Sequence, residues 1–201
     1  HPRFGVLDVV PWVDLDDPGA PATARSLAIR DRFAAWVGAE LALPAFVYGP
    51  ERPLPDVRRT AWRSLPPDAG PPAPHPSAGA VAVGARGVLI AYNLWLATAD
   101  GGQARRIAAA VRRPGLRTLG LVVGDRAQVS CNLVDPLHLG PAQAYDVIRD
   151  EAAKSGTTVT GAELVGLVPE AVLAAITPRR WSELDLGPER TIEARLRTPT
   201  A

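Results

Sequence analysis

The chain has little of several residue types that define large protein classes. Cys131 is its only cysteine, Lys154 its only lysine, and it contains no methionine. One cysteine cannot form an internal disulfide, which fits a reducing compartment, and we expect a cytoplasmic protein. No apolar run is long enough to span a bilayer, and no signal peptide is visible. A formal net charge of +1 leaves no charge excess to attract nucleic acid or a membrane surface.

General-purpose catalytic and metal-binding motifs are missing as well. The run Gly84-Ala85-Arg86-Gly87 lacks the glycine spacing and the Lys-Ser/Thr ending of a phosphate-binding loop. His1, His75 and His138 are far apart in the sequence, so no metal site is predicted. No serine lies in a nucleophile elbow. Spacing alone therefore predicts an α/β protein without defined chemistry.

The residues that are present favour a fold of the α/β (α+β) class. The chain has 201 residues, of which 47% are hydrophobic and 21% charged, enough for a core and a hydrated surface. A stretch rich in proline, with little hydrogen-bonding capacity of its own, separates two regions that alternate strand-like and helix-like sequence. We expect two small sheet-plus-helix subdomains, at 1–66 and 79–201, joined by 67–78.

The first region is predicted to contain strands at 4–13 and 45–48 and helices at 22–43 and 55–64. In the second, strands are predicted at 79–84, 88–97, 116–124, 127–134 and 157–168, with helices at 99–113, 141–155 and 169–176. Asp100 is placed to cap a helix, Gly124-Asp125-Arg126 favours a hairpin turn, and Gly156 ends a helix. The order β-α-β-β-α-β indicates a ferredoxin-like arrangement, and the polar tail from Thr177 is expected to pack weakly.

Several stretches together resemble the formiminotransferase family. The opening HPRFGVLDVVPWV resembles the family segment H-P-R-x-G-x-x-D-V-x-P, and Val47-Tyr48-Gly49 fits its next strand end. Pro67 to Leu96 fits the join between the family's two subdomains, Gln128 to Asp135 (QVSCNLVD) fits a strand, and Ala162 to Pro169 (AELVGLVP) fits the last strand and turn. Their shared order along nearly the whole chain makes the resemblance specific.

The resemblance implies two α/β subdomains with a folate-binding groove between them, and transfer of a formimino group from N-formimino-L-glutamate to tetrahydrofolate, the co-substrate. It implies a catalytic histidine at His1. Arg3 would bind a substrate carboxylate through its guanidinium. The family's folate-binding loop falls on Gly70, Pro71, Pro72, Ala73, Pro74, His75, Pro76, Ser77, Ala78 and Gly79; a passive interdomain linker is the other interpretation of that stretch.

The implied reaction requires a group that can both accept and donate a proton, which a histidine can do. The N5 amine of tetrahydrofolate must lose a proton as it attacks the formimino carbon, and the nitrogen of glutamate must gain one to leave. Histidine has an unperturbed pKa of about 6.5, so it can serve both needs near neutral pH. Without the resemblance, His1 would be read as a frayed terminal residue.

The sequence suggests structural or alternative roles for several other residues. Asp8 could orient His1 or Arg3, or be a turn-facing acid. Asn93 and Asn132 could face the groove or satisfy backbone groups. Cys131 is expected to be a small buried hydrophobe. The tryptophans Trp12, Trp62, Trp95 and Trp181 are expected in the core, and the arginine pairs at 58–59, 105–106 and 112–113 mostly on solvated helix faces.

Two alternative functions remain: another folate one-carbon transferase, such as one that handles formyl groups, and a non-catalytic folate-binding protein of the same fold. The resemblance places the leading activity in histidine degradation, with folate and formiminoglutamate as partners and no nucleic acid or membrane. Family members commonly dimerise, so a homodimer is one possible assembly. The resemblance also leads us to expect that the N-terminal part of the family's domain is missing here.

Overall fold

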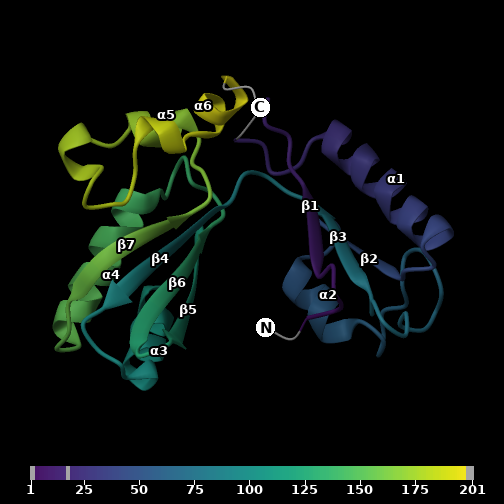
Figure 1. The fold of residues 1–201 in the computed structure, drawn as a ribbon, viewed down its shortest axis with the longest axis horizontal. Helices are drawn as coiled ribbons and strands as arrows, with labels where there is room; N and C mark the ends of the chain where they lie inside the picture. The colour runs from purple at the N-terminus through teal and green to yellow at the C-terminus, as the bar shows by residue number, and fades with distance from the viewer. Residues whose placement is uncertain (1–2, 17–18, 198–201) are drawn as a thin grey trace. The chain divides into compact units, whose positions relative to one another are not determined.

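The computed structural model describes residues 3–16 and 19–197 and contains two compact units, which divide between Val88 and Leu89. Each unit has its own sheet and its own helices (Figure 1). The mixed α/β class with two sheet-plus-helix units is therefore confirmed. Each unit is described by itself below.

The first unit is built on a parallel sheet. Its strands lie in the order β1-β3-β2, with bounds β1 (Val9–Trp12), β2 (Ala45–Tyr48) and β3 (Val81–Ala85). In the central strand, Val83 pairs with Val10 on one side and with Val47 on the other. The first strand is shorter than the predicted 4–13, because residues 4–8 form bends and one isolated bridge instead of a ladder.

Helices cover both faces of this parallel sheet. Val37 of α1 (Ala24–Glu40) packs with Val83 on one face, and Val57 of α2 (Leu54–Thr60) packs in a separate cluster on the other. A parallel strand covered on both faces has no hydrated side, so its sequence has no polar alternation. This explains the uninterrupted small and apolar run of β3, in which every residue is buried.

The boundary between the units differs from the predicted one. Residues 67–78 were expected to join the subdomains, and 79–84 to open the second, yet β3 is the central strand of the first unit. The chain leaves this unit only after β3. A short apolar run indicates a buried strand but does not say which sheet it joins, because that depends on pairing with distant strands.

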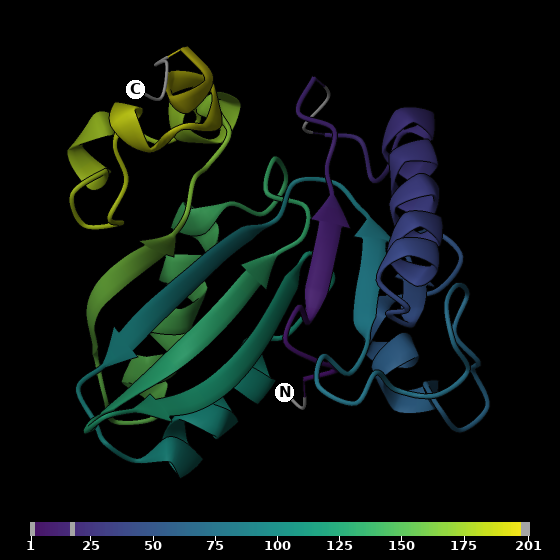
Figure 2. The same cartoon turned by 45° about the vertical axis from the view of Figure 1, so that its right-hand side comes forward.

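The second unit has the predicted β-α-β-β-α-β order, which starts at the strand after Val88 (Figure 2). Its antiparallel sheet has the order β5-β6-β4-β7. The strands are β4 (Ile90–Leu96), β5 (Leu116–Val123), β6 (Arg126–Leu133) and β7 (Val159–Val165), and the helices are α3 (Gly101–Val111) and α4 (Pro141–Lys154).

One face of this sheet carries the core. Ile90, Tyr92 and Leu94 of β4 are fully buried in a cluster that contains Ile107 of α3 and Ile148 of α4. Along β4 these buried residues alternate with half-buried ones, as expected for an antiparallel strand with one packed face. The opposite face is called the open face below.

Local signals set the ends of these elements as predicted. Asp100 accepts a hydrogen bond from the Gly102 amide at 2.7 Å and caps α3. Gly124, at φ +62°, and Asp125 form the turn between β5 and β6. Gly156, at φ +74°, follows α4. Each signal rests on backbone geometry within a few residues, which a sequence can express without tertiary contacts.

The tail after Thr177 packs firmly, so the expectation of weak packing was wrong. It follows α5 (Glu170–Ala174) and contains two short 3₁₀ helices (Pro178–Arg180, Pro188–Arg190) and α6 (Ile192–Arg197). Leu184 is fully buried in the core of the second unit, and its carbonyl accepts a 2.9 Å hydrogen bond from the Tyr92 hydroxyl.

Candidate functional site

The segment expected to carry the catalytic histidine is described from Arg3 onward. His1 and Pro2 lie outside the described residues, so the role of His1 stays a prediction. The Arg3 side chain is exposed, and its Nη2 donates to the Val6 carbonyl at 3.1 Å. A guanidinium has five N–H donors, so this contact leaves donors for a carboxylate. The proposed anchoring role of Arg3 is compatible with that geometry.

The loop expected to bind folate is fixed at both ends by glycine. Gly70 has φ +83°, and a Cβ there would lie 2.8 Å from the Leu43 carbonyl oxygen. Gly38 in α1 packs so closely that its own Cβ would lie 2.6 Å from the Gly70 nitrogen. Gly79 has φ +72°, and a Cβ there would lie 2.3 Å from the Phe4 carbonyl oxygen. These contacts hold the loop ends against the first unit.

His75 folds the second half of the loop. Its backbone exchanges hydrogen bonds with Gly79 at 2.8 and 2.9 Å. Its Nδ1 accepts from the amides of Ala78 at 3.1 Å and Ser77 at 3.3 Å. A ring nitrogen that accepts carries no proton, so the neutral ring is protonated at Nε2 and keeps that N–H as a donor. The outer loop residues are exposed: Pro72, Ala73, Pro74, Pro76 and Ser77.

Backbone hydrogen bonds join the two predicted segments, although they lie far apart in the sequence. The Val6 amide donates to the Ala78 carbonyl and the Ala80 amide donates to the Phe4 carbonyl, each at 3.1 Å. Between them Gly5 forms an antiparallel bridge with Gly79. Phe4, Gly5 and Val6 therefore lie against the end of the Gly70–Gly79 loop, within one unit.

Asp8 has a partner that the sequence did not suggest. It accepts from the Phe4 amide at 2.8 Å and from both Arg58 terminal nitrogens, at 3.2 and 2.7 Å. The hydrogen bond from Arg58 holds the pKa of Asp8 below its usual range. Arg58 is mostly buried, unlike the solvated helix residue that was predicted. Asp8 thus fixes the turn at Phe4 and forms an ion pair with Arg58.

A cavity of about 380 Å³ beside α1 also contains charged groups. Arg30, almost fully buried, makes a bidentate ion pair with Glu51, with both contacts at 2.8 Å. The hydrogen bond from Arg30 lowers the pKa of Glu51 to about 2. Because the two charges already compensate each other, we interpret the pair as structural.

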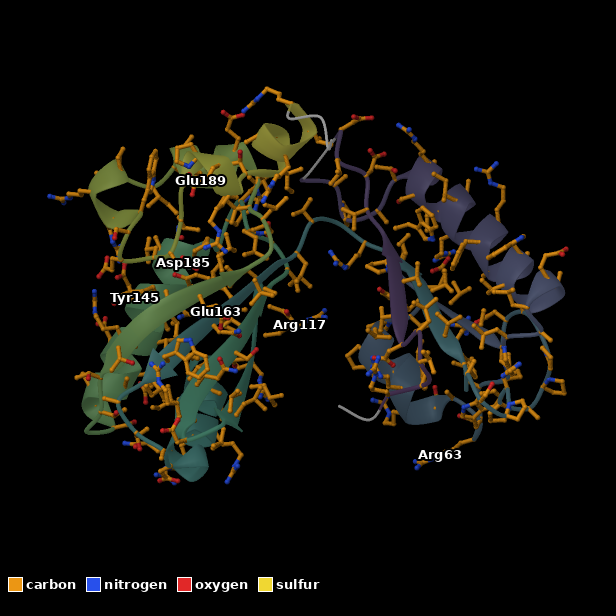
Figure 3. All side chains as sticks on the ribbon, in the orientation of Figure 1. Arg63, Arg117, Tyr145, Glu163, Asp185 and Glu189 are labelled. Carbon is orange, nitrogen blue, oxygen red and sulfur yellow. The ribbon has the colours of Figure 1, made fainter. Side chains whose placement is uncertain are left out.

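The open face of the second unit gathers polar side chains from all four strands. Cross-strand pairing puts Asn93 beside Glu163 on β7 and Ser130 on β6, and Asn132 beside Arg117 on β5. The Asn93 amide donates to Glu163 at 3.1 Å. Figure 3 shows Glu163 and Arg117 on this sheet. Asn93 and Asn132, left open by the sequence, both lie on this face.

Sequence reasoning missed Glu163, Arg117 and Gln128 on the open face. Alternation within each strand was the available signal, but the sheet order that brings the strands together was needed to use it. The tryptophans also divide: Trp12 and Trp181 pack against cores as expected, whereas Trp62 is exposed. Trp95 lies on the open face under Arg126, whose guanidinium carbon is 4.6 Å from the ring centre.

Residues 3–16 and 19–197 contain neither a metal-binding cluster nor a membrane-spanning helix. Within these ranges no group of three or more His, Cys, Asp or Glu side chains could hold a metal ion. Nor do these ranges contain a helix both long and apolar enough to cross a membrane. Burial raises the pKa of the Cys131 thiol to about 12, and the residue is the small buried hydrophobe that was predicted.

Comparisons with known proteins agree with the resemblance. A model of the N-terminal subdomain of the formiminotransferase domain matches residues 1–86, and one of the formiminotransferase domain matches residues 91–178. The chain is 34% identical to a glutamate formimidoyltransferase from Streptococcus pyogenes and 32% identical to one from Thermoplasma acidophilum; each alignment covers 86% of this chain and 64% of the relative. A formimidoyltransferase-cyclodeaminase from Rattus norvegicus is 32% identical, over 84% of this chain and 36% of the relative.

The chain thus spans 64% of the length of the two glutamate formimidoyltransferases. The two family models meet between residues 86 and 91, where the structure divides into its units. The matched segments, the order of the elements and the identity to these relatives agree, and the chain belongs to the formiminotransferase family.

Proposed function

We propose that the protein containing this chain transfers a formimino group from N-formimino-L-glutamate to tetrahydrofolate, as a step of histidine degradation. The observation that carries the proposal is the backbone junction of Phe4 and Val6 with Ala78 and Ala80. It holds the chain after His1 beside the end of the loop that the family resemblance assigns to folate. The two sequence segments with proposed roles are therefore neighbours in the first unit, which supports the proposal.

In this proposal the loop binds tetrahydrofolate and Arg3 binds a substrate carboxylate. The loop suits a flat ligand because its proline residues restrict the backbone and its outer residues are exposed. His75 retains an Nε2–H donor toward the ligand. A cytoplasmic location, expected from the single cysteine, is also part of this proposal.

His1 would act as the general acid and base. It accepts the proton of N5 as the bond from N5 to the formimino carbon forms. It then delivers a proton to the glutamate nitrogen as the bond from that nitrogen to the same carbon breaks. The products are formimino-tetrahydrofolate and glutamate, and His1 accepts one proton and donates one in each turnover.

The test is formation of formimino-tetrahydrofolate by the full-length protein and its His1→Ala variant. We expect the variant to lose turnover by roughly 100-fold or more. His138→Ala is the matched control, since His138 is an exposed histidine paired with Asp135 in the second unit. Full activity of His1→Ala would remove His1 from the mechanism.

Two outcomes with the unmutated protein would redirect the assignment. If tetrahydrofolate binds but formiminoglutamate is not turned over, another one-carbon reaction, such as formyl transfer, or a folate-binding role without catalysis would replace the proposal. If tetrahydrofolate does not bind at all, the fold serves another purpose.

A further inference from the structure

We propose that the open face of the second unit binds the formimino donor, with Glu163 facing its cationic formimino group and Arg117 facing one of its carboxylates. This inference rests on the proposed function, since it assigns positions to that reaction's own substrate. The first unit's loop is not part of it.

The two charged residues share one face of the sheet. Arg117 is directly opposite Asn132, Asn132 is opposite Ala91, and Ala91 is opposite Val165. Residues directly across from each other point to the same side, and so do residues two apart in a strand. Glu163 is two residues from Val165, so its side chain lies on the same face as that of Arg117.

The separation of the two residues suits a small ligand between them. They lie on opposite edge strands, three strand spacings of about 4.8 Å apart, and are offset by one two-residue step of about 6.7 Å. Their Cα atoms are therefore roughly 16 Å apart. The Glu163 carboxylate reaches toward β4, where it accepts from Asn93, and the spacing between the edges leaves room for a molecule of a few bonds' length over the central strands.

The charges on the face are available to a ligand. Within residues 3–16 and 19–197, the Arg117 guanidinium makes neither a hydrogen bond nor an ion pair, and the Glu163 carboxylate is hydrogen-bonded only to the neutral amide of Asn93. Between them lie the uncharged Asn93, Ser130 and Asn132. In these rows the β7 edge is thus anionic, the β5 edge is cationic, and the residues between them offer neutral hydrogen-bonding groups. Arg126, a further cation on this face, lies beyond Gln128 and over Trp95.

Gln128, in the next set of residues paired across the strands of the open face, supplies a second hydrogen-bond acceptor. Gln128 is two residues from Ser130 on β6 and is only 6% exposed, and its Oε1 has no hydrogen-bond partner within the described part of the chain. A buried acceptor without a donor is unfavourable. Apolar residues accompany it on this face, with Leu121 opposite Gln128 and Leu119 opposite Ser130. Ligand sites commonly combine such apolar surface with a few polar groups.

N-formimino-L-glutamate has the matching chemistry. Its formimino group is an amidine, which is protonated near neutral pH and presents N–H donors in a plane, as a guanidinium does. Such a cation forms charge-assisted hydrogen bonds with a carboxylate, and the carboxylates at the other end match an arginine. A neutral formyl group at the same position would gain less from Glu163.

The experiment measures binding and kinetics in four proteins: the full-length enzyme, Glu163→Gln, Arg117→Gln and a control variant. We expect each variant to bind N-formimino-L-glutamate at least about tenfold more weakly by calorimetry, the usual scale for losing a charged hydrogen bond. The KM for tetrahydrofolate should stay within about twofold, because only one substrate loses a contact. Glu151→Gln on α4 is the matched control, since its carboxylate pairs with Lys154 instead.

N-formyl-L-glutamate serves as a neutral probe of the same size. The unmutated protein should prefer the formimino compound, and Glu163→Gln should lose most of that preference while Arg117→Gln keeps it. Unchanged donor binding in both variants, with normal turnover, would overturn this inference and leave the proposed function intact. Failure of the unmutated protein to bind the formimino compound at all would overturn both.

Discussion

Glycine residues decide the position of the proposed folate loop. At Gly79 two demands coincide, a left-handed backbone at φ +72° and a Phe4 carbonyl oxygen 2.3 Å from where a Cβ would be. At Gly124 only the first demand exists, since φ is +62° and nothing lies within 4 Å of the added atom. The two positions separate backbone strain from steric contact.

We predict that Gly79→Ala destabilises the protein by about 3 kcal/mol or more, because left-handed strain is added to overlap with backbone atoms. Gly124→Ala should cost about 1 kcal/mol, from strain alone. Urea unfolding of both variants measures the difference. Equal effects would mean that the Phe4 segment moves aside easily, and that the junction with the loop is weak.

At the scale of elements, side chains bond backbone groups on one edge strand of each sheet. On β2 the Val47 amide donates to Asp68 at 2.7 Å and its carbonyl accepts from Arg52 at 2.8 Å. On β7 the Leu164 amide donates to Asp185 at 2.8 Å. Edges satisfied in this way are protected from pairing with other chains.

The tail therefore supports the second unit as an integral element. We predict that Leu184→Ala, which empties a fully buried site, lowers the free energy of unfolding by about 2–5 kcal/mol. Leu196→Ala, at a side chain that is 68% exposed, should change it by no more than about 0.5 kcal/mol. Thermal unfolding of both variants tests this, and a small effect at Leu184 would show that the tail only rests on the core.

At the scale of the whole molecule, the two units combine different kinds of sheet. The parallel sheet is covered by helices on both faces, and the proposed folate loop is one of the connections between its strands. The antiparallel sheet has its helices on one face and leaves the other open. The proposed folate loop and the proposed donor face thus belong to units with separate cores.

This separation predicts independent effects on the two substrates. His75→Ala removes the acceptor of the Ala78 amide and should raise the KM for tetrahydrofolate, whereas Arg117→Gln should raise that for the formimino donor. In the double variant the fold losses in kcat/KM should multiply to within about twofold, as for sites that share no partner. Steady-state kinetics of the four proteins checks this, and a clear departure would reveal coupling between the loop and the face.

The sequence by itself determined the class of the fold, the order of most elements, the caps and turns, and the family. These depend on periodicity, on residues such as Asp100, Gly124 and Gly156, and on motifs read along the chain, all of which are local. The burial of Cys131 followed from its apolar surroundings in the same way.

Only the tertiary structure decided which sheet β3 joins, how the tail packs, that Asp8 pairs with Arg58, and that Glu163 and Arg117 share a face. Each of these is a contact between residues far apart in the chain. Local propensity fixes which backbone shape a segment adopts, but partners are chosen by burial and pairing of the whole unit. For the same reason, the junction of Phe4 with Ala80, on which the proposed function rests, was absent from any sequence pattern.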